Sequence, residues 1–320
     1  MPNYQGVWSL STQFQAQGQG NWPIIYGGDI GANHVGVSGG VASASVEYIN
    51  IASAGNSTAY GDLSIARYLT SSCGSATRGV WAAGNPLYDT IEFITFSSGG
   101  NATSFGSLSA GARVGTGTSN STRGLFALGY DGSRSNTIDY ITIATASNAT
   151  DFGDLTVARY GLAGGASTTR ALFSGGNASS GRVNTIDYVT IGSTGNATDF
   201  GDLTEGIDGI TNTACSSTRS VRMGGRDTGG GRVNTIDYVT IASTGNATDF
   251  GDLVEAINES PSALSNSVTG LNAGGQNASG AVNSIVSITI ASTGNASDFG
   301  DLLATSSAGS GCSNSHGGIS

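Results

Sequence analysis

The sequence has no lysine, few histidines and cysteines, and little charge of either sign. Its twelve basic residues among 320 are all arginines, so catalysis through a lysine Schiff base is excluded. Only 11% of residues are charged and the formal net charge is −10, which disfavours nucleic-acid binding because that needs a cationic surface. Two histidines and three cysteines are too few for a zinc-finger array or a disulfide framework. No cofactor or metal centre is predicted.

Long apolar stretches are missing too. No window approaches the roughly 18 apolar residues of a membrane span, so we expect no such span. The opening Met-Pro-Asn-Tyr-Gln-Gly lacks the charged region and the apolar core of a signal peptide. Secretion through such a signal is therefore not expected.

Glycine is abundant, with 52 residues, and in a chain without a period this composition is typical of disorder. Here a phrase such as IDYVTIASTGNATDFGDL recurs at intervals of about 45 to 50 residues. A period of this length indicates a solenoid, a propeller or an array. The six copies begin at Val46, Ile91, Ile138, Ile186, Ile236 and Ile285.

Each repeat contains four short β-strand candidates, which we name A to D in chain order. In the repeat around Arg159 they are Tyr160–Ala166, Ala171–Ser174, Asn184–Ile191 and Thr198–Leu203. β-branched and aromatic residues fill the strands, and Gly, Asn, Ser and Thr fill the connections. Four antiparallel strands per repeat, repeated six times, predict an all-β fold, namely a β-propeller of four-stranded blades.

A propeller closes when one blade takes strands from both ends of the chain. Ala304–Cys312 resembles a strand A that no strand C or D follows, and His34–Gly40 (HVGVSGG) aligns with the strand B sequence RALFSGG. We therefore expect residues 33–320 to form six blades, closed by pairing of N- and C-terminal strands, and residues 1–32 to form a separate leader. The alternative is seven blades, with Val7–Leu10 and Asn21–Ile24 in a split blade.

The order of these features resembles the kelch repeat of β-propellers. A double glycine closes most B strands, and an aromatic residue stands in strand D where kelch proteins place tryptophan. The repeats at Gly84 and Gly129 depart from this pattern because they carry a single glycine. The arginine that opens strand A in kelch proteins is found only in the earlier repeats, as Arg67, Arg113 and Arg159.

The repeat sequence NTIDYVTIASTGNATDFGDLT is also similar to repeats in virion proteins of marine bacteriophages, including cyanophages, over roughly residues 33–320. This resemblance implies a structural or fibre protein of a virion, assembled in the host cytoplasm. It implies other virion proteins as partners, a host surface protein or glycan as ligand, and a homo-oligomer as a further option.

Motifs with catalytic or metal-binding potential have simpler explanations. The stretch Gly36–Gly40 matches G-x-S-x-G, but a hydrolase nucleophile needs a strand-to-helix elbow, and here another strand follows. The recurring Asn-Ala-Thr-Asp offers oxygens for calcium and formal glycosylation sequons, yet turn chemistry between strands C and D explains it. No catalytic residue is predicted, and Cys73, Cys215 and Cys312 are expected to be small buried thiols.

Two sets of charged residues recur at fixed positions, which predicts ion pairs within or between blades; a ring of ligand-binding arginines is the alternative. The acidic set lies in strand C and consists of Glu47, Glu92, Asp139, Asp187 and Asp237. The basic set precedes strand B and consists of Arg78, Arg123, Arg170 and Arg219.

The connections between strands differ in how much they vary. The A–B and C–D connections share one face of a propeller and scarcely change, whereas the B–C and D–A connections share the other face and vary in length and chemistry. We expect ligand binding on the variable face, because loops held by a rigid scaffold usually carry function. Acidic residues in the later D–A connections would divide this face into a basic and an acidic half. The candidate binding residues are Tyr88, Tyr130, Arg134, Arg226, Arg67, Arg113 and Arg159.

The leader carries Trp8, Phe14 and Trp22, which we expect to dock the propeller onto a virion or sister subunits, or else to plug one end of it. Together these features predict a non-enzymatic virion protein: a fibre, decoration or host-adhesion subunit that binds protein or glycan. The alternative is a secreted or cell-surface kelch-like carbohydrate-binding module. A propeller-type enzyme is disfavoured because the acids follow the repeat rather than converging on one site.

Overall fold

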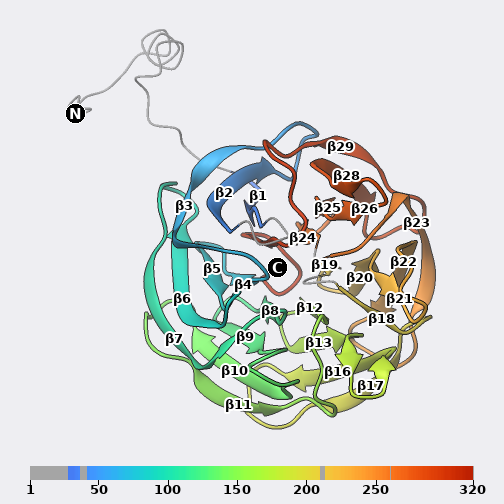
Figure 1. Ribbon diagram of the computed structural model, residues 1–320, viewed down its shortest axis with the longest axis horizontal. Helices are drawn as coiled ribbons and strands as arrows, with labels where there is room; N and C mark the ends of the chain where they lie inside the picture. Colours follow the sequence, from blue (N-terminus) through green and yellow to red (C-terminus); the bar gives the residue numbers. More distant parts are fainter. Residues whose placement is uncertain (1–27, 37–41, 210–212, 260, 320) are drawn as a thin grey trace, which may run out of the picture.

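Alternating apolar and polar residues between Gly- and Asn-rich turns produce short antiparallel strands that must pack against neighbours to bury their apolar faces. The computed structural model describes residues 28–36, 42–209, 213–259 and 261–319. Within these residues the strands form six four-stranded sheets, arranged as blades around a central axis (Figure 1). The prediction of an all-β propeller with six blades is therefore confirmed.

Five blades each take their four strands from one stretch of chain. Blade 2 consists of β4 (Ser71–Gly74), β5 (Arg78–Ala82), β6 (Tyr88–Thr95) and β7 (Thr103–Ala112). Blade 3 consists of β8 (Thr116–Ser119), β9 (Arg123–Ala127), β10 (Thr137–Thr142) and β11 (Thr150–Asp154). Blade 4 consists of β12 (Ala163–Ala166), β13 (Arg170–Ser174), β16 (Thr185–Thr190) and β17 (Thr198–Asp202).

Blades 5 and 6 follow the same order, and three small ribbons decorate the later blades. Blade 5 consists of β19 (Ala214–Cys215), β20 (Arg219–Met223), β22 (Val233–Thr240) and β23 (Thr248–Ile257). Blade 6 consists of β24 (Ser262–Ser265), β25 (Thr269–Ala273), β28 (Ser284–Thr289) and β29 (Ser297–Asp301). The ribbons pair β14 (Asn177–Ala178) with β15 (Gly181–Arg182), β18 (Ile207–Asp208) with β21 (Arg226–Asp227), and β26 (Gln276–Asn277) with β27 (Gly280–Ala281).

Blade 1 closes the propeller with strands from both ends of the described chain. Its order from the axis outwards is β30 (Ser310–Ser313), β1 (Ile30–His34), β2 (Ser43–Asn50) and β3 (Thr58–Arg67). The innermost strand is C-terminal, and Cys312 pairs with Ala32 in antiparallel register. The predicted closure is therefore confirmed.

The predicted position of strand B in blade 1 was wrong by four residues. Ile30 pairs with Asn50, as Arg170 pairs with Thr190 in blade 4, so the strand begins at Ile30 and ends at His34. The double glycine in HVGVSGG imitated the end of an ordinary strand B; its residues 37–41 lie outside the described part of the chain, as do Val7–Leu10 and Asn21–Ile24.

The recurring phrase joins each blade to the next. In every repeat the asparagine that opens the turn between strands C and D points its side-chain oxygen at the preceding blade. There the oxygen accepts a hydrogen bond from the main-chain N–H of the residue that follows the glycine of strand D. For Asn246 the donor is the N–H of Asp202, at 3.1 Å. Asn56 does the same for Asp301 across the closing junction. A Cβ added at Gly201 would lie 2.5 Å from the carbonyl oxygen of Gly245, so the close approach of these turns requires glycine. The six asparagines are Asn56, Asn101, Asn148, Asn196, Asn246 and Asn295.

Apolar side chains of neighbouring blades form the core between them. Leu125 and Phe152 of blade 3 cluster with Phe173 and Ile191 of blade 4, for example. Burial of each such side chain stabilises the fold by about 1.5–3 kcal/mol. The described residues contain no helix with the length and hydropathy needed to cross a membrane.

Candidate functional site

The acidic residues of strand C do form buried ion pairs, but with arginines other than the predicted set. Arg67 pairs with Glu92 at 2.6 Å, Arg159 with Asp187 at 3.0 Å and Arg222 with Asp237 at 2.7 Å. These carboxylates also reach the preceding blade, where Asp187 accepts the main-chain N–H of Thr156 at 3.1 Å. These carboxylates therefore help to fix one blade against another.

The arginines that precede strand B have a different role from the predicted one. Each places its guanidinium over an aromatic ring of its own strand C and donates Nη1 to a main-chain carbonyl of the next blade. Arg170 lies 4.9 Å from the ring centroid of Tyr188 and donates to Ile241 at 3.0 Å. Arg78, Arg123 and Arg219 repeat this arrangement. They are inter-blade clamps and do not form a ring of ligand-binding groups.

One residue of each D–A connection lies at the mouth of the central axis, and its backbone is left-handed in five of the six connections. We call these the mouth residues: Leu69 (φ 58°), Val114 (54°), Gly161 (68°), Gly209 (77°), Glu259 (59°) and Ala308, the last without a left-handed φ. Hydrogen bonds connect five of them in sequence, from the N–H of Leu69 to Ala308, Val114 to Leu69, Gly161 to Val114 and Gly209 to Gly161, over 2.8 to 3.2 Å. Left-handed backbone costs a non-glycine residue about 1–3 kcal/mol, and at Leu69 and Val114 these bonds help to offset that cost.

The number of residues between each arginine and its mouth residue explains why three arginines of similar sequence context differ in burial. Arg67 and Arg159 lie two residues before their mouth residues, and both are fully buried in ion pairs. Arg113 lies one residue before Val114, so Ala112 occupies the buried place. Arg67 and Arg159 are therefore buried below the predicted binding face, whereas Arg113 is half-buried and reaches it.

The missing arginine leaves the acid of blade 3 without a counter-ion. Asp139 is fully buried and accepts the N–H of Ser109 at 2.8 Å, and its Oδ1 has no hydrogen-bond partner among the described residues. In blade 1 the arginine place is taken by Ser306; Glu47 accepts hydrogen bonds from the Ser57 hydroxyl and the Leu303 N–H, while burial raises its pKa.

The mouth residues surround a cavity of about 260 Å³ on the face of the B–C and D–A connections, which we call the axial pocket. All six D–A connections contribute to its wall. Tyr68 and Tyr160 supply aromatic surface, and Asp208, Arg226 and Glu259 supply charge. Ligand sites typically combine such apolar walls with a few placed polar groups. The axial pocket is therefore the strongest candidate site of the described chain.

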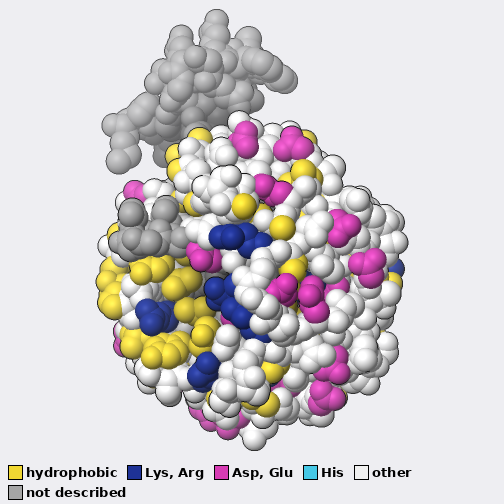
Figure 2. Space-filling model, turned by 45° about the vertical axis from the view of Figure 1, so that its right-hand side comes forward, with side chains coloured by type: hydrophobic (Ala, Val, Ile, Leu, Met, Phe, Trp, Pro, Cys, Tyr) yellow, Lys and Arg dark blue, Asp and Glu magenta, His cyan; other side chains and the backbone are white. Residues whose placement is uncertain are grey.

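An aromatic and arginine cluster flanks the axial pocket on blades 2 to 4. Arg113 lies 5.0 Å from the ring centroid of Tyr130, and Arg134 lies 5.4 Å from that of Tyr160. The two tyrosines pack edge to face with centroids 6.2 Å apart. Figure 2 shows one area of the surface where hydrophobic side chains surround arginines. Beside it lies an area where arginines and acidic side chains are close together.

Of the predicted binding residues, the structure brings Tyr130, Arg113, Arg134 and Arg226 to this face. Tyr88 begins β6 on the same face, half-buried and away from the pocket wall. The predicted division into a basic and an acidic half is not observed, because the buried Asp208 is enclosed by Arg182 and Arg226 in the supposedly acidic half. Tyr68, Tyr160 and Arg182 were missed; the varying D–A and B–C connections that hold them were the available signal.

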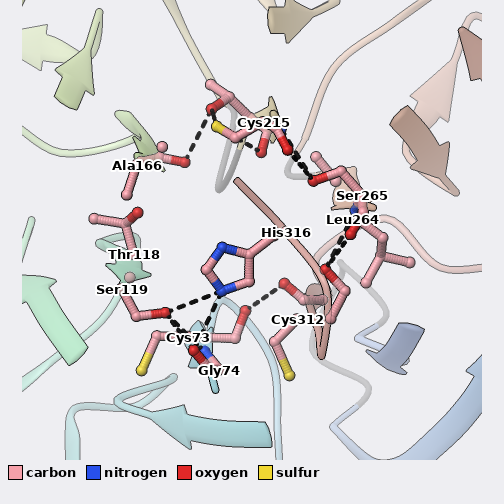
Figure 3. A pocket seen from close by; sticks show the side chains of 18 residues that line it. Cys73, Gly74, Thr118, Ser119, Ala166, Cys215, Leu264, Ser265, Cys312 and His316 are labelled. Carbon is pink, nitrogen blue, oxygen red and sulfur yellow. Dashed lines mark hydrogen bonds between the residues drawn. The ribbon is translucent and has the colours of Figure 1, made fainter. Parts of the chain in front are cut away.

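A second, smaller cavity of about 40 Å³ lies deeper on the axis, between the A strands of all six blades and the C-terminal turn (Figure 3). His316 points into it and bonds to the Ser119 hydroxyl at 3.3 Å and the Gly74 carbonyl at 3.2 Å. Its Nδ1 accepts the N–H of Gly318, which fits a neutral ring, and burial lowers its pKa to about 4. A buried water needs about 10–15 Å³, so this cavity holds a few waters at most and no substrate.

All three cysteines of the chain are free and buried, as predicted. They surround the deeper cavity, and burial raises the pKa of each thiol. Because the thiolate is the reactive form, these residues are poor nucleophiles. The described residues contain no group of three or more His, Cys, Asp and Glu arranged to hold a metal ion.

Trp8, Phe14 and Trp22 of the predicted docking segment lie outside the described residues. A scan against protein-family models and a search of curated proteins found no match to this chain.

Proposed function

We propose that this protein is a non-enzymatic recognition propeller of a bacteriophage particle, a fibre, decoration or host-adhesion subunit that binds its ligand in the axial pocket. The observation that carries the recognition role is the axial pocket itself, with two tyrosines and three charged residues in its wall. The proposal that the protein belongs to a phage particle rests on the amino-acid sequence of the repeat, which is similar to that of repeats in virion proteins. The kelch-like character rests likewise on sequence order.

The two faces of the propeller support this role. On the A–B and C–D face, the recurring asparagines and arginines form inter-blade hydrogen bonds, so these residues maintain the fold. On the other face the connections vary and leave Arg134, Arg226 and Glu259 accessible. A rigid frame with one variable face is typical of a binding module.

The chemistry of the pocket wall favours a polar ligand with an apolar face, such as a glycan. Tyr68 and Tyr160 offer surface for stacking, and Glu259 and Arg226 offer an acceptor and donors for hydroxyl groups. The same site would serve a secreted or cell-surface carbohydrate-binding module, which is the alternative setting for this fold.

Binding of labelled full-length protein to a panel of bacterial cells and surface saccharides tests the proposal. We expect Tyr68→Ala with Tyr160→Ala to reduce binding at least tenfold, because both aromatic walls are lost. The matched control replaces the exposed Thr168, Thr194 and Thr244 on the opposite face by alanine. Loss of binding in the control alone would place the binding site on the face of the A–B and C–D connections and would contradict the proposal.

Immunogold labelling of phage particles tests the assignment to a virion separately. Gold at a defined position on intact particles is expected. Labelling of the bacterial surface in uninfected cells would instead support the alternative module.

A further inference from the structure

An interaction between neighbouring B–C connections repeats around the variable face. Arg134 of blade 3 donates Nε and Nη2 to the main-chain and side-chain oxygens of Asn177 in blade 4, at 3.1 and 3.0 Å. Arg232 of blade 5 donates the same two groups to Gln276 of blade 6, at 3.1 and 2.7 Å. In both cases an arginine clamps the amide residue that follows the glycines of strand B in the next blade.

The junction between blades 4 and 5 breaks this rule. Arg182 occupies the place of Arg134 and Arg232, but the residue opposite is Arg226 in place of an amide. Arg182 turns instead to Asp208, which accepts its Nε at 2.8 Å and the Nε of Arg226 at 3.1 Å on the same oxygen. The other oxygen of Asp208 accepts the side-chain N–H of Asn177 at 3.0 Å.

Within the cluster of Arg182, Arg226 and Asp208, one positive charge has no carboxylate of its own. Two guanidinium groups share one buried carboxylate, and each uses only its Nε in that contact. Their Nη atoms have no hydrogen-bond partner within the described residues, although the side chains are 17% and 37% exposed. The terminal N–H groups of two fixed arginines are suited to a carboxylate or another oxyanion, which guanidinium groups bind through paired hydrogen bonds.

Part of this cluster lies at the axial pocket. Arg226 and Asp208 belong to its wall together with Glu259, opposite Tyr68 and Leu69, whereas Arg182 is not a wall residue. A volume of about 260 Å³ is below the roughly 300–1,000 Å³ of pockets that enclose drug-sized molecules, and it fits one ring-sized group. An anion at Arg226 would therefore belong to a ligand whose ring lies against the tyrosines.

We propose that the axial pocket binds the carboxylate-bearing sugar of an acidic saccharide, with Arg226 as the anion-binding residue. Arg182 shares the charge of Asp208, which leaves the Nη atoms of Arg226 available to the ligand. This inference rests on the proposed recognition function and narrows its ligand class. It assigns to Arg226 a specificity role that the repeat's usual amide could not provide.

Replacing Arg226 by the amide of the neighbouring junction is the sharpest test. The Arg226→Gln variant places an amide side chain opposite Arg182, as Gln276 lies opposite Arg232 in the wild-type chain. The fold should therefore be retained with an unchanged or higher melting temperature. Arg232→Gln on the same face changes the net charge equally and is the matched control. Arg182→Gln is a second variant that removes the excess charge from the other side.

The probes are oligosaccharides ending in glucuronic acid or N-acetylneuraminic acid, each with its neutral counterpart, titrated calorimetrically into the full-length protein. We expect preferential binding of the acidic probes, weakened about tenfold or more by Arg226→Gln and Arg182→Gln and little changed by Arg232→Gln. Equal binding of neutral and acidic probes would overturn the inference while leaving the recognition function standing.

An equal loss in Arg232→Gln would reduce the effect to net charge and would also overturn the inference. Absence of saccharide binding would overturn it too. Cell binding that persists in that case, and that is lost in the Tyr68 and Tyr160 variant, would show that the recognition function survives with another class of ligand.

Discussion

The Arg159–Asp187 ion pair can be exchanged for apolar residues that the same chain already uses elsewhere. In the connection that leads into blade 4, the residue two positions before the mouth residue is Arg159. In the connection that leads into blade 6, the residue at the same position is Ile257. The strand C position that faces them is Asp187 in blade 4 and Val286 in blade 6. The double variant Arg159→Ile with Asp187→Val therefore copies the solution of blade 6 into blade 4.

The single substitutions should be costly. Arg159→Ile removes the counter-ion of a fully buried carboxylate and a hydrogen bond to the Phe173 carbonyl at 3.0 Å. Breaking a buried pair in this way costs about 3–5 kcal/mol. We expect the lower end, because Thr156 still donates two hydrogen bonds to Asp187. Asp187→Val leaves the guanidinium buried without its acid and should cost a similar amount.

The double variant should recover most of that loss. Replacement of a buried ion pair by packed apolar residues is often neutral or stabilising. We expect a free energy of unfolding within about 1 kcal/mol of wild type, and thus a coupling energy of about 3 kcal/mol or more between the two sites. Urea denaturation followed by tryptophan fluorescence and circular dichroism gives all four values of the cycle. Losses in the double variant that equal the sum of the singles would refute the reasoning.

Three further predictions address the closure, the inter-blade turns and pH. Deleting Ala304–Ser320 removes the innermost strand of blade 1, so soluble monodisperse protein should be lost in size-exclusion chromatography; a truncated protein with an unchanged melting temperature would contradict the closure. Asn246→Ala removes the bond to the Asp202 N–H and should cost about 1 kcal/mol of unfolding free energy in urea, whereas no change would show the turn to be dispensable. Burial lowers the pKa of His34 from 6.5 to about 4, so the unfolded chain binds the extra proton and stability falls as pH drops from about 6.5 to 4, by up to about 3 kcal/mol. Thermal melts across this window should show a smaller slope for His34→Gln, and equal slopes would count against the assignment.

The repeat made the architecture predictable. Strand alternation, turn residues and a period near 48 residues act over a few neighbours each, and they led to the blade, to the blade number and to closure by the C-terminal strand. The buried thiols followed from the same reasoning. The failure at HVGVSGG was local as well, because a double glycine marked the end of a strand that the hydrogen-bond register places four residues earlier.

Sequence alone determined that this chain is a propeller of four-stranded blades with one constant and one variable face, because short-range patterns specify strands and turns. It favoured six blades over seven, and the structure shows six. Only the tertiary structure decided which arginine meets which acid. A shift of one residue leaves Arg113 half-buried and buries Ala112 in the place of an arginine, and where Arg226 replaces an amide, Arg182 pairs with Asp208. Such contacts join connections of different blades, so they depend on backbone positions that no single repeat contains.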